Sequence, residues 1–594
     1  MERWVIKNKK ADFKEIMDKY QVSEILARLM VNRGHVSDEE ITAFLSEDLT
    51  KMHSPFTMKD IVKAVNLIDM KIKEKKSIRI VGDYDVDGII STFILYKALN
   101  RVGAVVDYEI PDRVKDGYGI NVSIIDAAKE DQIDTILTCD NGIAAISQIQ
   151  HAKEMGMTVI ITDHHDLQFT REEVVTDGIV TEKIVHHIPI ADAVVNPKQE
   201  DCEYPFEGIC GAMVAFKLIA VLYERFHVSN TELYDFVQYV SIATVCDVMD
   251  LVDENRILVK QGLRQLQNTN NFGLKALMDV NGIHSDSLSA YHLGFVIGPC
   301  LNASGRLESA KLGLELLLTD TSSKALEVAV ELKALNDTRK ELTLKGTKEA
   351  IEMVESSSLN DDIVLVVYLP ECHESLAGII AGRLKERFYK PTIVLTKGEH
   401  GVKGSARSIP EYNIFEELTK CKEYLTKFGG HPMAAGLSLE EDMIEPLRRA
   451  LNEKTTLTKT DFIPKISIDI VLPLGYINET MIEELEKLEP FGKGNSKPIF
   501  AERDLKIQKA NIIGKNSNVL KMRVVNNYGR VMDALYFGDI TQFQTYVCEK
   551  FSADEYEKML AGSENQVTLS MLYYPSINEY AGNRTTQIII QSYQ

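Results

Sequence analysis

Apolar and polar positions follow two alternating patterns along residues 77–250. Short runs rich in Ile, Val and Thr, such as IRIVG at 78–82 and TVIIT at 158–162, are typical of buried strands. Longer stretches between them, such as ISTFILYKAL at 90–99, repeat apolar residues at the spacing of a helix. Strands that alternate with helices predict a parallel sheet covered by helices.

The pattern is helical on either side of this region. In residues 1–70, VSEILARLM and SDEEITAFL have apolar residues near the helical spacing, which indicates an accessory helical cap. Helical patterns also dominate from 250 to about 320. Residues 323–357 contain no proline and, apart from Gly346, no glycine, so one long helix is predicted there.

A second strand and helix pattern begins with DIVLVVYLP at 362 and continues through KPTIVLT. The stretch LEPFGKGNSKPIF is rich in Pro, Gly, Asn and Ser and is typical of a connecting turn. Beyond it, short strands at even spacing predict a small antiparallel barrel of the oligonucleotide-binding (OB) type.

The chain is predicted to be an α/β protein of several domains, because 594 residues exceed the roughly 250–300 at which one core stops growing. We expect a parallel-sheet domain and a second α/β domain joined by a long helix, followed by an antiparallel OB-like β-barrel. The expected limits are 1–70 for the cap, 71–322 for the parallel-sheet domain, 323–357 for the helix, 358–455 for the second α/β domain and 456–594 for the barrel with its linker.

Composition indicates a folded protein of the cytoplasm without a membrane partner. Hydrophobic residues make up 45% and charged residues 26%, which are ordinary globular values. The start of the chain is too charged for a signal peptide, and no apolar run approaches the roughly 18 residues that span a bilayer. The eight cysteines are scattered without a CxxC pair, so reduced thiols are expected.

The net charge of −21 argues against a surface that is basic all over. One local exception runs from Cys372 to Arg407, where seven Lys or Arg stand against three Glu. This stretch is a candidate phosphate-facing surface, although a solvated helix face explains such a run equally well.

Three predicted strands each end on an aspartate, in GDYDVDG at 82–88, TCDNG at 138–142 and TDHH at 162–165. The carboxyl ends of parallel strands open onto the ligand crevice of such a sheet, so these side chains should converge. Oxygen and nitrogen donors gathered in this way suit two divalent cations.

In GDYDVDG, an extended backbone would point Asp83, Asp85 and Asp87 to one side. Carboxylates this close repel each other unless cations neutralise them, so the cluster predicts metal. The alternative is an Asp-rich turn or a calcium-type loop, although the glutamate that closes an EF-hand loop is absent.

The remaining acids and histidines also indicate a metal site, some more specifically than others. Asp140 follows a buried strand, but capping of the next helix is an equally good explanation. Asp163, His164 and His165 together offer a metal ligand, a group for a phosphate and a group that orients the ligand. Asp247 is a lone acid in the apolar run SIATVCDVMDL, where burial without a partner would be costly.

These motifs resemble a known family. GDYDVDG, TCDNG, the DHH triplet at 163–165 and VCDVMD resemble the four catalytic motifs of the DHH phosphoesterases, and GGHPMAAG at 429–436 resembles their companion DHHA1 domain. The likeness continues through PDRVKDGYG, GPCLNASGRL, GSARS and PFGKGNSKPIF, as in the RecJ branch of bacterial single-strand-specific exonucleases. It covers nearly the whole chain.

The resemblance implies a set of site residues. Two divalent cations, Mn²⁺ or Mg²⁺, would be held by five ligands with Asp83 in support, and His165 would face the scissile phosphate. The implied ligands are Asp85, Asp87, Asp140, His164 and Asp247, and the implied substrate-binding residues are Arg113, Asn302, Arg306, Ser405, Arg407, His431, Gly429 and Gly430.

The resemblance also implies an activity: 5′-to-3′ hydrolysis of single-stranded DNA by a two-metal mechanism, with release of mononucleotides, in DNA repair and recombination. Single-stranded DNA would be the partner, with a single-strand-binding protein and a helicase as further candidates. Two alternatives stay open, a DHH-type phosphodiesterase acting on short oligonucleotides or cyclic dinucleotides, and a noncatalytic DNA-binding scaffold. The scaffold is disfavoured because every ligand position is filled.

The sequence departs from the RecJ pattern at two places. Cys300 stands where the pattern has Arg, and CHESLAGIIAGRL keeps only His373 of an opening that usually reads Trp-His followed by Pro-Gly. Loss of a positive group could change substrate affinity. The metal ligands are all present, so we expect an active enzyme.

Overall fold

A computed structural model describes residues 2–594 of the chain with several short gaps. Two compact units are present, one made of residues 1–46 and 464–594 and the other of residues 47–463. The finer domain limits expected from the sequence stay predictions. The gaps are 114–116, 118, 177–178, 399–400, 515–516 and 581, and only the backbone is described for 173–176, 179–182 and 580.

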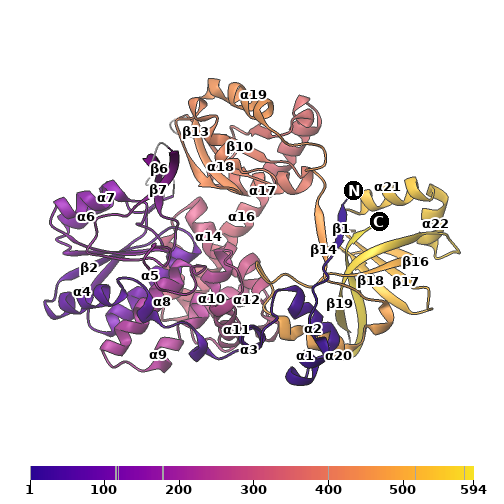
Figure 1. The fold of residues 1–594 in the computed structure, drawn as a ribbon, viewed down its shortest axis with the longest axis horizontal. Helices are drawn as coiled ribbons and strands as arrows, with labels where there is room; N and C mark the ends of the chain where they lie inside the picture. Colours follow the sequence, from indigo (N-terminus) through magenta and orange to yellow (C-terminus); the bar gives the residue numbers. More distant parts are fainter. Residues whose placement is uncertain are drawn as a thin grey trace. The chain divides into compact units, whose positions relative to one another are not determined.

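The unit of residues 47–463 contains the predicted parallel sheet. Its apolar strands are buried, with helices on both faces, which confirms the predicted fold class (Figure 1). On one face lie α5 (Val86–Arg101) and α8 (Gly211–Arg225), and on the other α6 (Val122–Glu130) and α7 (Ile146–Glu154). The strand order is β3 (Val105–Glu109), β2 (Ser77–Val81), β4 (Thr135–Cys139), β5 (Thr158–Thr162) and β8 (Ala193–Val195), with every pairing parallel.

A hairpin is inserted in the chain between two neighbouring strands of this sheet, β5 and β8, which still pair with each other. Strands β6 (Gln168–Thr176) and β7 (Ile179–His187) lie in the chain between β5 and β8 and pair only with each other among the described residues. Figure 1 draws them as a separate two-stranded ribbon. The sequence analysis does not anticipate this hairpin.

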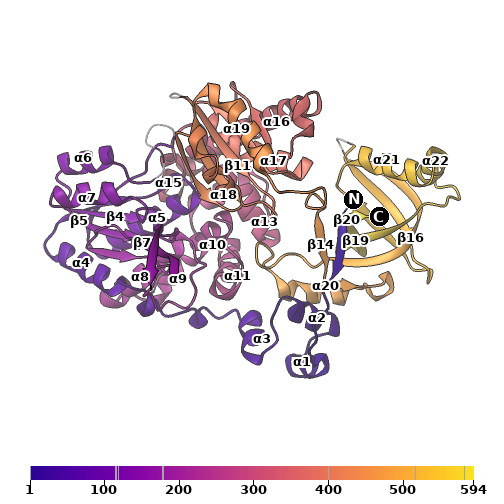
Figure 2. The ribbon, with the colours of Figure 1, turned by 45° about the horizontal axis from the view of Figure 1, so that its top comes forward.

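The predicted long helix is present as α16 (Ser322–Glu355), 34 residues in length. It packs against α12 (Phe272–Val280) and α14 (Gly298–Leu307) near one end and against α17 (Ala377–Phe388) near the other. It therefore joins a first lobe (residues 47–321) to a second lobe (residues 356–463), as Figure 2 shows. Among the described residues, none of the helices combines the length and the apolar character that a bilayer crossing requires.

The second lobe is built on a mixed five-stranded sheet. Only the pairing of its first two strands along the chain is parallel, and the other three are antiparallel. The strand order is β12 (Lys427–His431), β13 (Ala434–Leu439), β11 (Val402–Arg407), β10 (Thr392–Lys397) and β9 (Leu365–Tyr368).

The other unit contains the predicted barrel with one correction. Its sheet closes because β16 (Phe500–Ile513) pairs with β19 (Thr568–Tyr580) as well as with β17 (Val519–Val525). The prediction of a purely antiparallel barrel is wrong, because two pairs are parallel: β15 (Ile470–Val471) with β16, and β18 (Val531–Tyr536) with β20 (Asn583–Tyr593). The helices α21 (Ile540–Lys550) and α22 (Ala553–Ala561) connect β18 to β19, and β19 is antiparallel to β20, so β20 runs in the same direction as β18.

The N-terminal segment is only partly helical. Strand β1 (Arg3–Ile6) pairs in parallel with β14 (Lys465–Ile468), so the expectation of helix throughout residues 1–70 is wrong at its start. Short apolar runs such as RWVI fit a strand when a partner strand is available elsewhere in the chain. Helices α2 (Glu24–Asn32) and α3 (Asp38–Leu45) share the core of the barrel unit, whereas α4 (Ile61–Lys73) belongs to the core of the parallel sheet.

Candidate metal centre and phosphate-binding cleft

The acid and imidazole side chains expected at one sheet edge do lie together. They follow strands β2, β4 and β5 and the end of α10 (Val237–Cys246), which brings side chains from distant parts of the sequence to one place. Within each of three groups the ligand atoms lie within 4.8 Å of one another. The groups are Asp83, Asp85 and Asp140; Asp87, His164 and Asp247; and Asp140, His164 and His165.

The GDYDVDG segment reaches this arrangement through a helix cap. The prediction of an extended backbone over Asp83, Asp85 and Asp87 is wrong, because Asp85 is the N-cap of α5. Its Oδ1 accepts hydrogen bonds from the backbone N–H groups of Asp87 at 3.0 Å and Gly88 at 3.1 Å. A short carboxylate satisfies the free N–H groups of a helix start, which favours helix over strand here.

Two glycines allow the helices to approach the acids. A Cβ atom at Gly88 would lie 2.4 Å from the carbonyl oxygen of Asp83, and one at Gly211 would lie 2.6 Å from Cβ of Asp140. The backbone N–H groups of Gly211 and Ala212, at the start of α8, donate to the two oxygens of Asp87 at 2.6 and 2.8 Å. The N-terminus of α8 therefore orients one carboxylate and lies against another.

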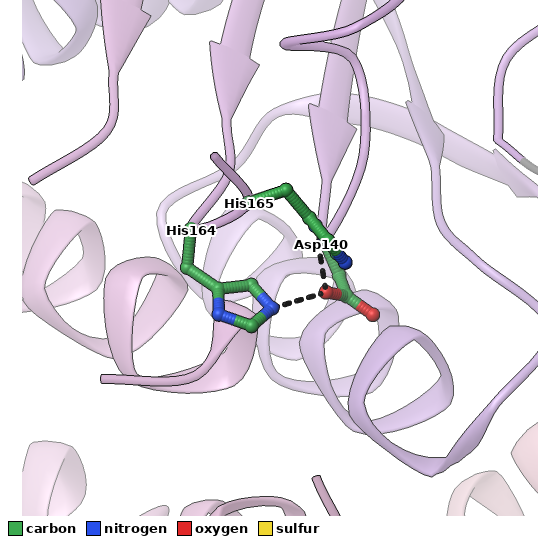
Figure 3. Close-up of side chains that lie close together, drawn as sticks. All are labelled: Asp140, His164 and His165. Atoms are coloured by element: carbon green, nitrogen blue, oxygen red, sulfur yellow. Dashed lines mark hydrogen bonds and ion pairs between the residues drawn. The ribbon is translucent and has the colours of Figure 1, made fainter. Parts of the chain in front are cut away.

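Asp140 lies at the centre of the cluster. Its Oδ1 is 3.1 Å from Nε2 of His164 and 3.9 Å from Nδ1 of His165, as drawn in Figure 3. The residue has a positive φ of 60°, and its backbone N–H donates to the carbonyl of Thr162. Asp140 does not cap the following helix, whose N-cap is Ala145.

Asp163 orients the two histidines. Its carboxylate accepts hydrogen bonds from the backbone N–H of Ile143 at 2.9 Å, from that of His164 at 2.7 Å and from Nδ1 of His165 at 2.8 Å. It is buried, and these donors occupy both of its oxygens. Asp163 therefore acts as the orienting group that the sequence analysis expected within the triplet.

Burial and mutual repulsion disfavour the ionised form of these carboxyl groups when no cation is bound. Burial, followed by the charge of neighbouring carboxylates, raises the pKa values of Asp83, Asp140 and Asp247 well above the usual range. The same causes raise the pKa of Asp87 to about 6. A cation would relieve both effects, because it replaces lost hydration and neutralises the repulsion.

The two histidines differ in charge. Burial, followed by the nearby His165, lowers the pKa of His164 to about 3, so its imidazole is neutral and available as a ligand. Burial opposes the charge of His165, but Asp163 outweighs it and raises the pKa of His165 to about 9. In the same pair, the charge and hydrogen bond of His165 overcome burial and lower the pKa of Asp163 to about 2.

The donor set fits hard divalent cations. One oxygen each of Asp83 and Asp247 is buried and has no hydrogen-bond partner among the described residues. Buried carboxylate oxygens in this condition are costly unless a ligand satisfies them. Carboxylates with one neutral imidazole match the preferences of Mn²⁺ and Mg²⁺.

A cleft of about 480 Å³ lies between the lobes beside this centre. Five of the eight substrate-binding residues expected from the sequence line it. Tyr84 also lines it, and the guanidinium carbon of Arg113 lies 4.5 Å from the centre of the Tyr84 ring. Because Tyr84 separates Asp83 from Asp85, the cleft adjoins the acid cluster. The five expected residues are Arg113, Arg306, Ser405, Arg407 and Gly429.

The arginines of this cleft bind neutral groups. Nη1 of Arg306 donates to the carbonyl of Ser375 at 2.6 Å, and Nη1 of Arg407 donates to Oγ of Ser405 at 3.2 Å. Burial lowers the pKa of both guanidinium groups. Neither forms an ion pair with a carboxylate among the described residues, so their charge is available to an anion such as phosphate.

Two further lysines line the cleft: Lys427 was missed by the sequence analysis, and Lys403 was expected only as one cation of the basic stretch from Cys372 to Arg407. Lys403 is paired with Glu374 at 3.0 Å. Lys403 directly precedes the GSARS motif, which is the signal that could have identified it. In the basic stretch from Cys372 to Arg407, only Lys403 and Arg407 of the seven cations line the cleft, and Glu399 lies outside the described residues.

The wall contributed by the second lobe is flat. Ser405, Gly436 and Gly429 are paired neighbours on β11, β13 and β12. A Cβ atom at Gly429 or Gly436 would meet no atom within 4 Å, so these glycines leave open space instead of permitting tight packing. At Gly430 the φ of 155° and a Cβ position 2.4 Å from the carbonyl oxygen of Ala434 require glycine.

Three expected substrate-binding residues lie outside this cleft. Gly430 and His431 line a second cavity of about 1500 Å³, where Nδ1 of His431 lies 3.4 Å from Asp166. Asn302 lines neither cavity, and its buried Oδ1 has no hydrogen-bond partner among the described residues.

Cys300, which stands where the RecJ pattern has Arg, is buried, and its sulfur accepts a hydrogen bond from Asn336 at 3.3 Å.

Comparison with known proteins gives matches along most of the chain. The profile of the DHH family N-terminal domain matches residues 77–244, that of the DHHA1 domain residues 361–456 and that of the RecJ OB domain residues 468–592. The single-stranded-DNA-specific exonuclease RecJ of Bacillus subtilis is 36% identical over 99% of this chain and 70% of its own length. The Escherichia coli protein of the same name is 31% identical over 96% of both.

Solved structures give the same result for the fold. The crystal structure of RecJ with Mn²⁺ from Thermus thermophilus superposes with a TM-score of 0.80 and 24% identity, over all of this chain and 79% of that one. The Mg²⁺ complex of the same protein gives a TM-score of 0.75. The likeness establishes the fold.

Proposed function

The chain belongs to the RecJ family of DHH phosphoesterases, and we propose that it is an exonuclease that hydrolyses single-stranded DNA from the 5′ end and releases mononucleotides. One observation carries the proposal. The acids and imidazoles of four separate motifs converge in groups whose ligand atoms lie within 4.8 Å of one another, beside a cleft in which Arg306 and Arg407 form no ion pair with a carboxylate among the described residues. Such a pairing of metal ligands with phosphate ligands suits phosphodiester hydrolysis.

Two divalent cations, Mn²⁺ or Mg²⁺, are the proposed cofactors. Held between carboxylates, such cations would neutralise charge on the phosphate and lower the pKa of water, which makes hydrolysis accessible near neutral pH. The residues proposed to hold them are Asp85, Asp87, Asp140, His164 and Asp247, with Asp83 in support, and each has a ligand atom in one of the three groups.

We propose that His165 interacts with the substrate phosphate and is not a ligand of the cations. Its Nδ1 is bound to Asp163, and its raised pKa gives the ring a positive charge at neutral pH. A charged ring at the edge of the acid cluster would stabilise the scissile phosphate and orient it. Because Asp163 fixes the ring, its orientation is set before substrate binds.

The cleft would bind phosphates of the strand. Arg113, Arg306 and Arg407 approach it from both lobes, and Arg recognises phosphate through parallel hydrogen bonds. The flat wall at Gly429 and Gly436 would let a strand lie close to the backbone. A cleft between two lobes admits one strand more readily than a duplex, which supports selectivity for single strands.

The cytoplasmic location, and a single-strand-binding protein and a helicase as partners, stay predictions from the sequence. The same holds for a role in DNA repair and recombination.

The proposal is tested by digesting long single strands blocked at either the 5′ or the 3′ end, with Mn²⁺ and with chelator. We expect mononucleotides from the 3′-blocked strand only, and no product with chelator. Digestion from the 3′ end, or hydrolysis restricted to strands of a few nucleotides, would contradict the proposal and favour a short-oligonucleotide phosphodiesterase. Binding without hydrolysis under all metal conditions would favour a scaffold.

A further inference from the structure

The second cavity, of about 1500 Å³, is lined mainly by residues to which the function proposed so far gives no role. One wall is the start of the hairpin β6–β7, including Leu167 and Phe169, and the opposite wall is formed by Phe415 and Phe428 of the second lobe. His165 of the candidate metal centre lines it as well.

Aromatic rings are presented on both walls of this cavity. Phe169 is 48% exposed although it is a large apolar side chain. Phe415 and Phe428 are half-buried, with ring centres 5.9 Å apart and planes tilted by 41°. Exposed aromatic surface beside an active centre is a recurrent platform on which unpaired bases stack.

The fold gives no structural reason for Phe169 to be there. The hairpin forms its own two-stranded sheet and adds no strand to the parallel sheet beside it. Among the described residues, the Phe169 side chain belongs to none of the buried clusters of the first lobe, and its ring has one aromatic neighbour, His186, whose ring centre lies 6.3 Å away. Removal of the ring should therefore cost the fold little.

The cavity is continuous with the phosphate-binding cleft. Phe428, Gly429 and Gly436 line both. The two glycines carry no side chain into the shared wall, and a Cβ atom at either would meet nothing within 4 Å. Lys427 also lines both spaces, so a strand that follows the glycines from the cleft to the cavity passes beside the side chains of Lys427 and Phe428.

Charge separates the roles of the two spaces. In the cleft, Arg306 and Arg407 form no ion pair with a carboxylate among the described residues, and the one lining acid, Glu374, is paired with Lys403. The cavity shares Lys427 with the cleft, and its other cations, Arg171 and Lys420, are accompanied by Asp166 and Glu416. Extra phosphate charge at a 5′ end is favoured in the cleft. The strand on the other side of the scissile phosphate then continues into the cavity, where apolar and aromatic groups favour bases.

We propose that this cavity binds the unpaired bases on the 3′ side of the scissile phosphate, with Phe169 stacking from the hairpin and Phe415 and Phe428 from the second lobe. The proposal rests on the exonuclease function proposed above. It assigns Phe169 as a residue that favours single strands, because paired bases cannot present their faces to rings on two walls.

The experiment uses the full chain with Mn²⁺ and compares Phe169→Ala with the wild type. The substrates are a single strand of normal sequence and one that is abasic at its second and third nucleotides. Because stacking on one aromatic ring is lost, we expect KM for the normal strand to rise roughly 5- to 150-fold with kcat little changed. For the abasic strand, KM should be the same in both proteins.

A matched control on the same hairpin is Ile184→Ala. Ile184 is 50% exposed, like Phe169, but does not line either cavity. This variant should leave KM unchanged on both strands. An equal effect of the two variants, or an equal effect of Phe169→Ala on normal and abasic strands, would overturn the proposal.

A binding measurement separates this proposal from the exonuclease function. With 2-aminopurine as the second nucleotide and with chelator present, we expect a fluorescence change on binding to the wild type that is lost in Phe169→Ala. If hydrolysis fails in all proteins but this difference persists, the base site stands and the exonuclease proposal falls. If hydrolysis proceeds and the difference is absent, the base site falls. Phe415→Ala provides the same test from the opposite wall should Phe169→Ala not fold.

Discussion

The acid edge of the first lobe and the glycine wall of the second lobe are built in opposite ways. The side chain of Asp140 is 3% exposed, whereas that of His431 is 64% exposed. Asp85 and Asp87 are fixed by backbone N–H groups at the starts of α5 and α8, while a Cβ atom at Gly429 or Gly436 would meet only open space. The difference suggests that the acid edge is preorganised for chemistry and that the wall is shaped for contact with a strand.

This comparison leads to a simple expectation. Changes at the acid edge should alter metal affinity and kcat, because the groups there act on the reacting phosphate. Changes at the wall and its arginines should alter KM, because those groups bind the strand in substrate and transition state alike.

The largest expected effect is that of Asp140→Ala, which should abolish cleavage of single-stranded DNA while strand binding is largely kept. Asp140 has ligand atoms in two of the three groups, so its removal should disrupt both cation sites. Hydrolysis of a labelled strand with Mn²⁺, together with strand binding by anisotropy, measures the two properties. Retained turnover would count against the assignment of the acid edge.

Asp163→Asn should weaken Mn²⁺ affinity roughly 10- to 100-fold without removing a ligand. An amide cannot accept all the hydrogen bonds that Asp163 receives from Ile143, His164 and His165. Titration of activity with Mn²⁺ should show recovery at high concentration, with KM for DNA unchanged. A variant that Mn²⁺ does not rescue would place Asp163 in a different role.

The stabilisation of the fold by Mn²⁺ should grow as pH rises from about 4 to about 6. The pKa of Asp87 is about 6 in the fold against an ordinary value of 3.8. In chelator the folded chain therefore keeps a proton that the unfolded chain releases, so the contribution of Asp87 to the free energy of unfolding falls across this window, by on the order of 3 kcal/mol. A bound cation replaces that proton and removes the loss.

The measurement is the difference in melting temperature with and without Mn²⁺ at several pH values between 4 and 8. Taking the difference cancels groups that do not contact the cation. A constant difference across this range would mean that Mn²⁺ binds away from Asp87.

The smallest effect is expected for Arg407→Ala, which should raise KM for single-stranded DNA by about 10-fold with kcat nearly unchanged, as one charge-assisted hydrogen bond to phosphate is lost. The salt dependence of binding should also become weaker. Arg407→Lys serves as the control, because it keeps the charge but loses the paired N–H groups. A large fall in kcat would mean that the wall takes part in chemistry.

The acid edge was predictable because strand ends obey a simple rule. Asp140, His164 and the neighbouring acids follow buried runs whose carboxyl ends meet at one sheet edge, and sequence alone reveals those runs. The long helix was equally clear, since 34 residues lack a strong helix breaker. Such features depend on local patterns.

Features that depend on contacts between distant segments were missed. Whether Asp85 ends a strand or caps a helix depends on the approach of α5 to the loop at Asp83, which no local pattern encodes. The parallel pair of β18 and β20 depends on the path of the chain around the barrel. Likewise, Phe169 and Phe428 are far apart in sequence, so their shared cavity appears only in the structure.

The account's central claim is that the converged acids and imidazoles hold two divalent cations. Anomalous diffraction from crystals of this protein grown with Mn²⁺ tests the claim most directly. We predict two adjacent peaks, one or both in contact with Asp140 and together in contact with Asp87, His164 and Asp247. Peaks elsewhere in the molecule, or an acid cluster without a peak at saturating Mn²⁺, would contradict it.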